Sequence, residues 1–484
     1  MSISSQRISY ATFRTLWKRI LPGASCTHRT NISGPEVERE KSLLRVFPAL
    51  LVGCVTFVWI YALSANVSPA YFGIGNDNFW FDADVPRYLC QIVDAGANDH
   101  WRNKIHPLFS LLVAPFPNML HMAGIDIIRA MRIQVALVAA VGMSFQYLLM
   151  RGIGLRMPAA VLLVGVIATS ASVLAWFTLV ESYAYTFTAF SIMLYFLVSA
   201  ARKPRGIGHW SGIIGLSFAI TISNVVVAGL AAWQALGMRR VLWAGSIALA
   251  TVTVLAVAQR LIFPLSGIFF LPSALDGETS FMVGISWERL RELFALVLYG
   301  SFLFPDVDVI ALGKGTMLST QNASFAQGVL PLFSMLLLSF LFLLGAAPLL
   351  RKLAQSFNNA VTGHIPNEDN ILTTLALPVL GSLTFLFVLH SFYGQETFLY
   401  TGSFLPLLGV LLALGLQSTW VRRFNLVLPL LAFLIVGNLT HNIPRFTEAS
   451  TLLRNAAALP VQAHSLKRKT CDFVKRSPLG QDKR

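Results

Sequence analysis

The chain has 484 residues, of which 55% are hydrophobic and only 12% are charged. An ordinary soluble domain carries about 25% charged residues, so this composition excludes a soluble enzyme, and its hydrophobicity excludes a disordered chain. The 37 lysine and arginine residues outnumber the 22 acidic residues and give a net charge of +15. These values indicate an all-α, polytopic membrane protein.

Residues 1–46 are polar and basic and hold no apolar run of the kind that a cleaved signal peptide needs. We expect a cytoplasmic tail, in which residues 8–21 form either a basic amphipathic helix on the inner membrane surface or a flexible segment. The four cysteines include no CxxC pair, which argues against a zinc knuckle or a thioredoxin-like motif. Cys90 and Cys471 can form a disulfide only if both lie outside the membrane.

Apolar runs come after the tail, and a membrane-spanning helix needs about 20 such residues. They occupy residues 47–65, 127–150, 158–178, 183–200, 241–262, 329–350, 371–392, 398–416 and 424–440. Residues 209–237 are long for one span and short for two, and a polar break near Ser223 predicts a pair of short helices. The sequence therefore predicts about eleven spans in a transmembrane domain 47–440, with outer loops 66–126 and 263–328 and a basic C-terminal tail 441–484.

Five short basic loops separate these runs. They carry Arg151 and Arg156; Arg202, Lys203 and Arg205; Arg239 and Arg240; Arg351 and Lys352; and Arg422 and Arg423. If residues 66–126 stay on one side, all five loops fall on the side of the N-terminal tail, which is the positive-inside pattern. The positive charge is then mainly a topology signal, and we expect no nucleic-acid partner. An odd number of spans places the basic tail 441–484 outside, so either the tail crosses despite its charge or the count is wrong by one.

Both outer loops are too apolar to be free in water. Residues 107–122 are too short and too rich in proline to span comfortably, and residues 287–304 have the pattern of an amphipathic helix followed by an apolar stretch. We expect both segments to lie along the outer membrane surface as juxtamembrane helices, with tryptophan and arginine at the level of the lipid headgroups.

The most informative segment comes directly after the first span. Asp77, Asp82 and Asp84 fall within eight positions of a chain that holds only 22 acidic residues. Two carboxylates two residues apart in an extended segment point the same way. They can therefore share a cation, or the charge of one can shift the pKa of the other into the range that a general base needs. Arg87 comes next as a fixed cation that suits a carboxylate or phosphate partner. The alternative is a solvated loop capped by aspartates.

Several basic residues fall on the predicted outer side, where the positive-inside rule does not account for them. Arg102, Lys104 and His106 precede the first surface helix, where they either hold a lipid phosphate or anchor the helix at the interface. Arg129 and Arg132 lie at the outer end of the second span, against the positive-inside trend. They fit either an anionic ligand or simple pairing with a nearby aspartate.

Further polar residues fall at the same outer edge. Glu181 comes after the third apolar run, and His390, Glu396 and Tyr400 lie in the loop 390–400. A carboxylate at the membrane edge is costly unless it is paired or hydrated. Helix capping would explain each acid separately, but three acidic sites on one face favour a polar cavity.

These residues give the chain a resemblance to integral-membrane glycosyltransferases of the GT-C fold, in particular to bacterial relatives of the dolichyl-phosphate-mannose protein mannosyltransferases and of the lipid A aminoarabinose transferase. The matching positions are Asp82 and Asp84 in the acidic motif of the first outer loop, Tyr88 after it, His106, Pro107 and Leu108 in the His-Pro-Pro-Leu element, and Glu181 after the third span. The resemblance covers roughly residues 47–240 and, more loosely, 390–416. The chain departs from the family at Leu108, where a second proline is usual.

The resemblance implies a polyprenyl-phosphate sugar as donor, an inverting transfer to a glycan, lipid or protein on the periplasmic face of a bacterial inner membrane, and a first-outer-loop aspartate as general base. The spacing to Tyr88 slightly favours Asp84 over Asp82 as the general base. The implied ligand-binding residues are Arg87, Arg102, Lys104 and His106 for phosphate, and Glu181 and Glu396 for hydroxyl groups. A divalent metal, Mg²⁺ or Mn²⁺, bridging the two aspartates is a further option.

Two other functions compete with this one. An O-antigen polymerase or ligase would rely mainly on arginine in its outer loops and would lack an acidic motif after the first span. A lipid-linked sugar transporter or flippase would place its polar residues near the middle of the bilayer. The sequence contains no P-loop, no HExxH and no GxSxG motif, so an ATPase, a zinc protease and a serine hydrolase are unsupported.

Overall fold

The computed structural model describes residues 35–68, 71–72, 79–271, 278–312, 315–320, 328–363, 370–394 and 396–458. Most of the N-terminal tail, Asp77, Cys471 and the end of the C-terminal tail therefore lie outside the described residues. A boundary between two compact units falls after Phe47, inside the first described helix. The larger unit begins at Pro48 and holds all of the candidate site residues that the structure describes.

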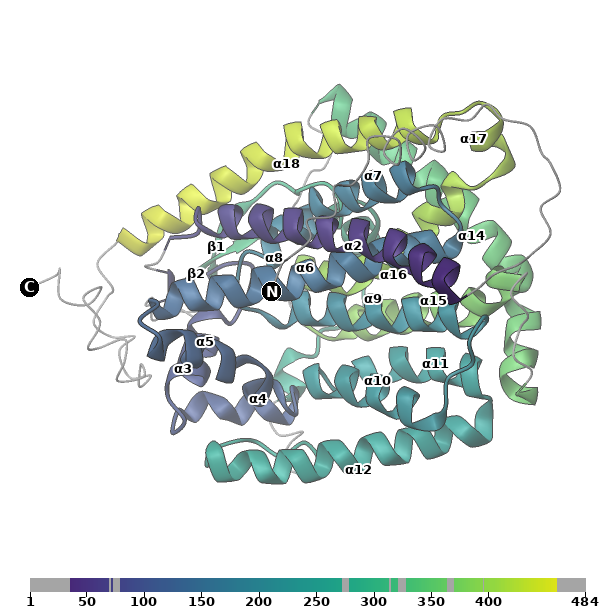
Figure 1. Cartoon of the computed structure of the whole chain (residues 1–484). Helices are drawn as coiled ribbons and strands as arrows, with labels where there is room; N and C mark the ends of the chain where they lie inside the picture. Colours follow the sequence, from purple (N-terminus) through teal and green to yellow (C-terminus); the bar gives the residue numbers. More distant parts are fainter. Residues whose placement is uncertain are drawn as a thin grey trace, which may run out of the picture. The chain divides into compact units, whose positions relative to one another are not determined.

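The described chain is almost entirely helical, with one two-stranded antiparallel hairpin (Figure 1). Its elements are α2 (Pro35–Ser64), α3 (Val85–Val93), η2 (Asn98–Lys104), α4 (Phe109–Val113), α5 (Pro115–Met122), α6 (Ile127–Ile153), α7 (Met157–Ala168), α8 (Ala171–Trp176), α9 (Ser182–Ala200), α10 (Ile207–Ile220), α11 (Asn224–Leu236), α12 (Met238–Ile262), η4 (Glu278–Phe281), α13 (Trp287–Ala295), η5 (Leu296–Gly300), β1 (Asp308–Leu312), β2 (Gly315–Ser319), α14 (Val329–Thr362), α15 (Ile371–Phe392), η7 (Phe398–Tyr400), α16 (Thr401–Leu416), α17 (Thr419–Arg423) and α18 (Val427–Ala458).

Eight of the described helices are long and apolar enough to cross a membrane, and α7, α10 and α11 are shorter apolar helices. The chain is therefore an all-α, multi-pass membrane protein, as its composition predicts. The pair α10 and α11 confirms that residues 209–237 form two short helices.

Two predicted spans differ from the observed helices. The run 158–178 is broken into α7 and α8, because Ser170 leaves the first helix and its hydroxyl accepts a hydrogen bond from the Val173 N–H at the start of the second. The last span does not stop at residue 440: α18 continues to Ala458. Its polar residues fit inside the bundle, since Asn442 binds the carbonyls of Thr169 and Phe302.

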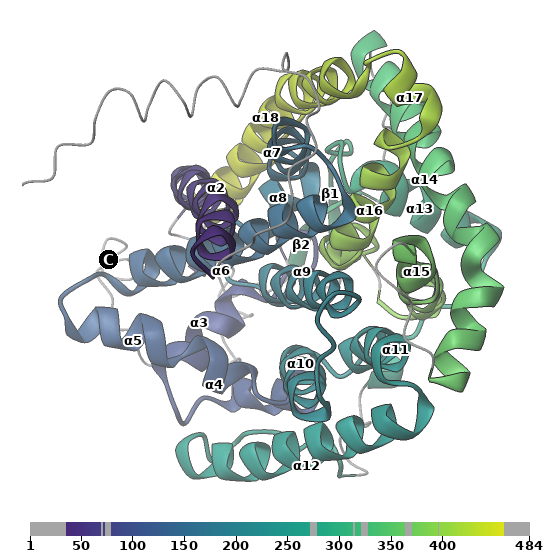
Figure 2. The same ribbon diagram turned by 45° about the vertical axis from the view of Figure 1, so that its right-hand side comes forward.

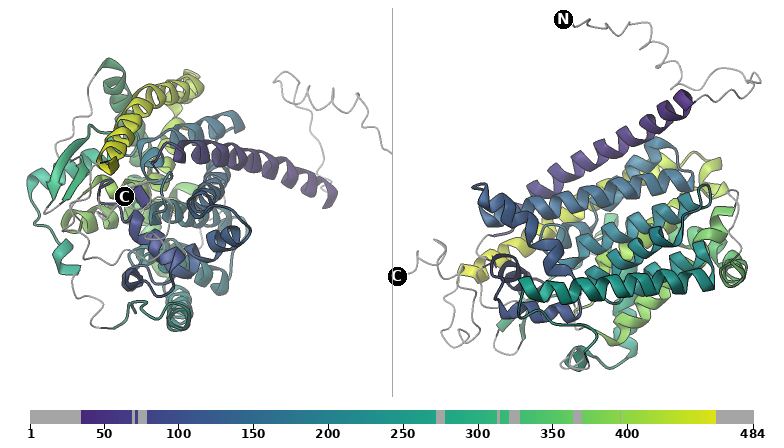
Figure 3. Two further views of the ribbon diagram at one scale, coloured as in Figure 1. Left: turned by 90° about the vertical axis from the view of Figure 1, so that its left-hand side faces the viewer. Right: turned by 60° about the horizontal axis from the view of Figure 1, so that its bottom comes forward.

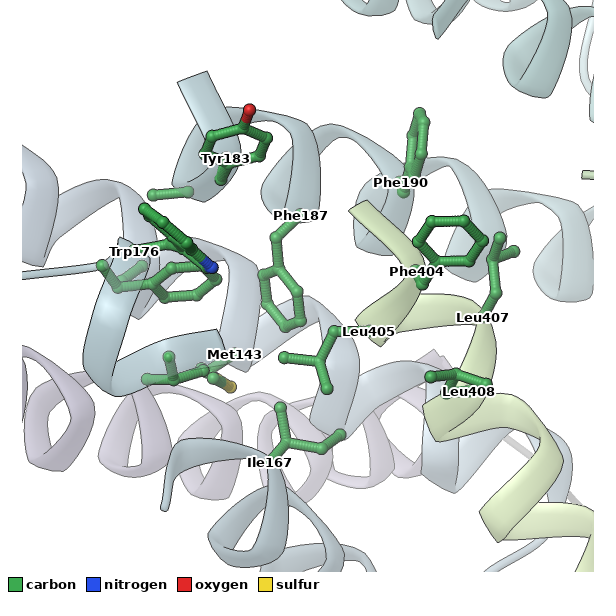
Figure 4. Packing of buried hydrophobic residues seen from close by; sticks show 14 of the residues in the cluster. Met143, Ile167, Trp176, Tyr183, Phe187, Phe190, Phe404, Leu405, Leu407 and Leu408 are labelled. Atoms are coloured by element: carbon green, nitrogen blue, oxygen red, sulfur yellow. The ribbon is translucent and has the colours of Figure 1, made fainter. Parts of the chain in front are cut away.

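The centre of residues 48–484 is α16, which packs against α9 and α14, whereas α12 lies at the edge (Figure 2). The surrounding protein buries 94% of the apolar window that contains α16 and 22% of that in α12. Leu405 of α16 lies between Phe187 and Ile167, and Phe404 faces Phe190 (Figure 4). Glycine permits the close approach to α14, because a Cβ at Gly415 would lie 2.2 Å from the Leu341 carbonyl oxygen.

One end of this bundle carries α3, α4, α5 and the β1–β2 hairpin, and α17 lies at the other end (Figure 1). Figure 3 looks onto the first end in its left panel and shows the hairpin at its margin. The expected surface segment 107–122 is two short helices, α4 and α5, which meet at Pro115, and the amphipathic start of 287–304 is α13. The first end of the bundle therefore carries the segments that hold the candidate acids and cations of the first outer loop.

Candidate functional site

The acidic motif forms a tight turn held by aromatic rings. Phe81 and Asp82 adopt positive φ angles of 48° and 65°, an arrangement that costs roughly 1–3 kcal/mol per residue. The Phe81 side chain is fully buried and makes edge-on contacts with four rings, those of Trp80, Trp176, Phe304 and Phe398. The expectation of an extended Asp82–Asp84 segment is therefore wrong, because the packing of Phe81 fixes a turn from Trp80 to Ala83 that includes Asp82.

Asp84 begins helix α3, and its contacts tie three segments together. Its carboxylate forms an ion pair with Arg87, one helical turn later, and lies 4.0 Å from Nε of Arg102. Its backbone N–H donates to Oε1 of Glu181 at 2.8 Å. The first outer loop is thereby joined to the start of α9, far along the chain.

Glu181 precedes α9 and is 4% exposed. Its second oxygen accepts a hydrogen bond from the Ser182 N–H at 2.9 Å, so backbone donors occupy both of its oxygens. Burial, reinforced by the negative charge of Asp84, raises the pKa of Glu181 to about 7. Its contacts position the acidic turn.

A buried carboxylate from the second outer loop completes the ion cluster. Glu278 is 6% exposed and lies 3.2 Å from the guanidinium of Arg102 and 3.2 Å from Nζ of Lys104. The hydroxyl of Tyr393 donates to its other oxygen at 2.7 Å. Charge-assisted hydrogen bonds of this kind are the strong ones, so Glu278 fixes the two cations.

An aromatic face also supports the cations. The ring centroid of Trp101 lies 5.7 Å from Arg87, 5.3 Å from Arg102 and 4.9 Å from Nζ of Lys104. Attraction to the π face and to the two carboxylates offsets the mutual repulsion of three positive charges. Arg102 keeps an Nε–H that donates no hydrogen bond within the described residues.

Asp82 has a different electrostatic environment from Asp84. Burial raises the pKa of Asp82 to about 7, and the charges of Asp84 and Glu396 add to the effect. At neutral pH this side chain exchanges between the acid and the carboxylate, which is the condition that a general base requires. Tyr88, one turn into α3, stays neutral because burial raises the pKa of its phenol well above the usual value.

His106 is uncharged at neutral pH. Burial lowers its pKa to about 4, and the positive charge of Arg102 acts in the same direction. Its Nδ1 lies 2.8 Å from the carbonyl oxygen of Ile220, the last residue of α10. The residue can therefore donate a hydrogen bond that holds the outer loop against α10, but it adds no cation for a phosphate.

The residues of the loop 390–400 form a second group. The His390 ring stacks on Tyr400 with a centroid separation of 3.8 Å. Glu396 is fully buried and accepts hydrogen bonds from Ser319, Thr320 and the backbone of Phe398. This carboxylate joins the end of the hairpin to η7, and its charge acts on the first group through Asp82.

Arg129 and Arg132 take other positions. Arg129 is exposed at the start of α6, and Arg132 donates to the carbonyl of Val67 at 2.6 Å. The hydrogen bond of Arg132 fastens the segment that follows α2 to α6. The structure thus gathers Asp82, Asp84, Arg87, Tyr88, Arg102, Lys104, His106 and Glu181, places the group His390, Glu396 and Tyr400 beside them, and leaves Arg129 and Arg132 apart.

Among the described residues, no three His, Cys, Asp or Glu side chains lie together in a way that would hold a metal ion. The ion pair with Arg87 also competes for the carboxylate of Asp84. The bridging Mg²⁺ or Mn²⁺ considered from the sequence therefore has at most two acidic ligands among these residues, which is a weak site for either ion.

An apolar cavity of about 240 Å³ lies beside this cluster, lined by residues of α4, α6, α9 and α10. Ile220 lines the cavity and also binds His106, so the polar and apolar regions adjoin. Tyr185, another lining residue, packs on Phe109 at 5.3 Å, and Phe109 packs on Tyr88 at 5.0 Å.

Sequence reasoning missed Glu278, Trp101 and Tyr393. Glu278 has no neighbouring motif, and only the fold brings it beside Arg102. Trp101 stands directly before Arg102 and three positions before Lys104 in a segment already singled out, so an aromatic residue close to two cations was a usable signal.

The fold and the site define a multi-pass helical membrane protein with a buried ion cluster at one end of its bundle. No model of a known protein family matches the chain, and no curated protein matches its sequence.

Proposed function

We propose that the protein is a glycosyltransferase that moves a sugar from a polyprenyl-phosphate donor to a hydroxyl group of a glycan, lipid or protein. One observation carries the proposal: a strained turn holds Asp82, whose pKa is about 7, beside a cluster of Arg87, Arg102 and Lys104. A base near neutrality next to paired cations suits a reaction that removes a proton and releases a phosphate.

In the proposed reaction, Asp82 accepts the proton of the acceptor hydroxyl as its oxygen attacks the anomeric carbon. The bond between that carbon and the phosphate oxygen breaks on the opposite face, which inverts the configuration. The bonding electrons leave with the phosphate, whose charge changes from one negative to two. Arg102 and Lys104 stabilise the developing charge because they are already held in place by Glu278.

The contacts favour Asp82 over Asp84 as the base, whereas the sequence slightly favoured Asp84. Asp84 is paired with Arg87 and lies near Arg102, so its carboxylate is already engaged by cations. Asp84 would instead fix the cations that face the phosphate.

The apolar cavity would receive the first isoprene units of the donor. It lies between membrane helices, and its lining residue Ile220 directly contacts the loop that carries Arg102 and Lys104. A tail in the bilayer and a phosphate at its edge match this change from apolar to charged surface.

We further propose a bacterial inner-membrane location with the site facing the periplasm. The five basic loops support this orientation by the positive-inside rule. Cys90, in helix α3 beside the site, is disulfide-bonded, and disulfides persist in oxidising compartments.

The test is sugar transfer in membranes that contain Asp82→Asn, Asp84→Asn or the native chain, with a labelled polyprenyl-phosphate sugar pool as donor. We expect Asp82→Asn to lose roughly 10²- to 10⁴-fold in rate, and Asp84→Asn to lose less. Asp308→Asn, at an exposed aspartate that begins strand β1, is the matched control and should keep full activity. Full transfer by both Asp82→Asn and Asp84→Asn would refute the assignment.

A further inference from the structure

Helix α3 carries a disulfide whose partner lies in another part of the chain. Cys90 is 6% exposed and disulfide-bonded, and it follows Arg87 by about one helical turn. The chain has three other cysteines, and Cys54 on α2 is a free thiol. Cys90 is therefore bonded to Cys26 or to Cys471, both of which lie outside the described residues.

The path of α18 determines where the C-terminal tail leaves the bundle. Helix α18 starts beside α17, at the end opposite the ion cluster, and runs toward that cluster (Figure 1). In its second half, the ring centroid of Phe446 lies 6.0 Å from that of Trp80, at the start of the acidic turn. Nη2 of Arg445 lies 2.6 Å from Oδ1 of Asp306. The chain that follows Ala458 therefore leaves on the side of the ion cluster.

The tail is also long enough to reach α3. The 13 residues from Ala458 to Cys471 extend over at most roughly 45 Å. The 12 residues of α18 from Phe446 to Ala458 rise about 18 Å. The tail can therefore return to the acidic turn and to α3, which begins directly after that turn.

The path of α2 argues against the other cysteine. Helix α6 begins directly after α5, at the end with the ion cluster. Arg132, near the start of α6, donates to the segment that follows α2, whereas Ser144, farther along α6, donates to the carbonyl of Ala49 in the middle of α2. The two helices therefore run antiparallel, and the chain before the apolar part of α2 leaves at the opposite end. That apolar part is long enough to span a membrane, so the bilayer separates Cys26 from Cys90.

We propose that a disulfide joins Cys90 to Cys471 and ties the basic C-terminal tail to α3 beside the ion cluster. The tail then lies on the side of the candidate site despite its charge, and an odd number of spans is correct. Three consecutive basic residues, 467–469, come shortly before Cys471. The bond holds them within a few residues of the helix that carries Arg87, where they can attract an anionic ligand toward the buried cluster.

The bond forms by oxidation of two thiols, for which the oxidant is an oxidoreductase that itself carries a disulfide. Each cysteine loses one proton, and the two sulfur atoms become joined. The two electrons and two protons that are released convert the disulfide of the oxidant into two thiols. Such bonds persist in oxidising compartments, which agrees with the proposed periplasmic side of the site.

Peptide mapping of the native chain tests the pairing without any variant. The full chain is purified from membranes in detergent, its free thiols are blocked with N-ethylmaleimide, and it is digested with trypsin under non-reducing conditions. We expect peptide 88–102, which contains Cys90, to be linked to peptide 470–475, which contains Cys471. The mass of the linked pair should disappear on reduction.

A link from peptide 88–102 to peptide 20–29, which contains Cys26, overturns the proposal, and so does an alkylated Cys90 in the native chain. Two matched variants give a second measurement, in which a polyethylene glycol maleimide counts the free thiols in SDS. We expect two thiols in the native chain, three in Cys471→Ser and one in Cys26→Ser. The reverse order of the two variants overturns the pairing.

The side of the tail is tested separately with Cys90→Ser, which releases the thiol of Cys471. A membrane-impermeant maleimide added to spheroplasts should label Cys471 and leave Cys26 unlabelled, as judged from the same tryptic peptides. Labelling of Cys26 instead, or of neither cysteine, overturns the assigned side. None of these measurements depends on sugar transfer, so they remain decisive whatever the Asp82→Asn assay shows.

Discussion

Basic residues at the two ends of the bundle differ in their surroundings. At the end with the ion cluster, Arg87 and Lys104 are 9% and 7% exposed, and each has a carboxylate partner and the face of Trp101. In the basic loops, Arg239 and Arg240 are exposed to solvent. The same residue types therefore occur in two settings: the exposed cations fit the predicted topology signal, and the buried, paired cations form the proposed binding site.

The largest expected effect is on stability at the ion cluster. Arg102→Gln leaves Asp84 and Glu278 with one cation fewer, and breaking a buried ion pair costs roughly 3–5 kcal/mol. Lys104 and Arg87 still pair with those acids, so we expect the free energy of unfolding to fall by an amount near the lower end of this range. SDS-induced unfolding in mixed micelles measures it. A loss below about 0.5 kcal/mol would place the cluster with ordinary surface ion pairs.

The next effect is the pH dependence of transfer. Burial raises the pKa of Asp82 to about 7, and only the carboxylate can accept a proton. We expect the rate to fall about tenfold per pH unit below pH 7 and to level off above it. A flat profile between pH 5.5 and 8 would argue against Asp82 as the base. Asp308→Asn should show the native profile.

The same titration has the opposite effect on stability. The pKa values of Asp82 and Glu181 rise from 3.8 and 4.5 to about 7 in the folded protein. The folded state keeps protons that the unfolded state has released, so the stability that these two groups contribute is fully present below about pH 4 and is lost as the pH rises through 7. The slope is at most about 1.4 kcal/mol per pH unit for each proton. Asp82→Asn should flatten the curve of unfolding midpoint against pH, and an unchanged curve would contradict the burial of this acid.

The smallest effect is expected in the basic loops. Arg240→Gln removes one exposed cation, and surface substitutions of this kind change stability by within about 0.5 kcal/mol. The rate of sugar transfer and the free energy of unfolding in micelles should both equal those of the native chain. A loss comparable to that of Arg102→Gln would remove the distinction between the two ends.

Parts of the site were predictable because local sequence carries them. Asp82, Asp84 and Arg87 stand out in an acid-poor chain, and proline and the amphipathic pattern indicate the surface helices. The conformation of the motif was not predictable, because Phe81 acquires its positive φ only among rings from α8, η7 and the segment before β1. Glu278 was missed for the same reason: its partners lie far away in the chain.

The sequence by itself determined the class of protein, since the number and length of apolar runs are local properties that a bilayer requires directly. It also supplied the candidate acids and cations. The tertiary structure decided which of those charges are paired, which are buried and which proton can move. Those properties depend on the distances between charged groups and on the local dielectric constant. Both are set only when segments far apart in the chain pack together.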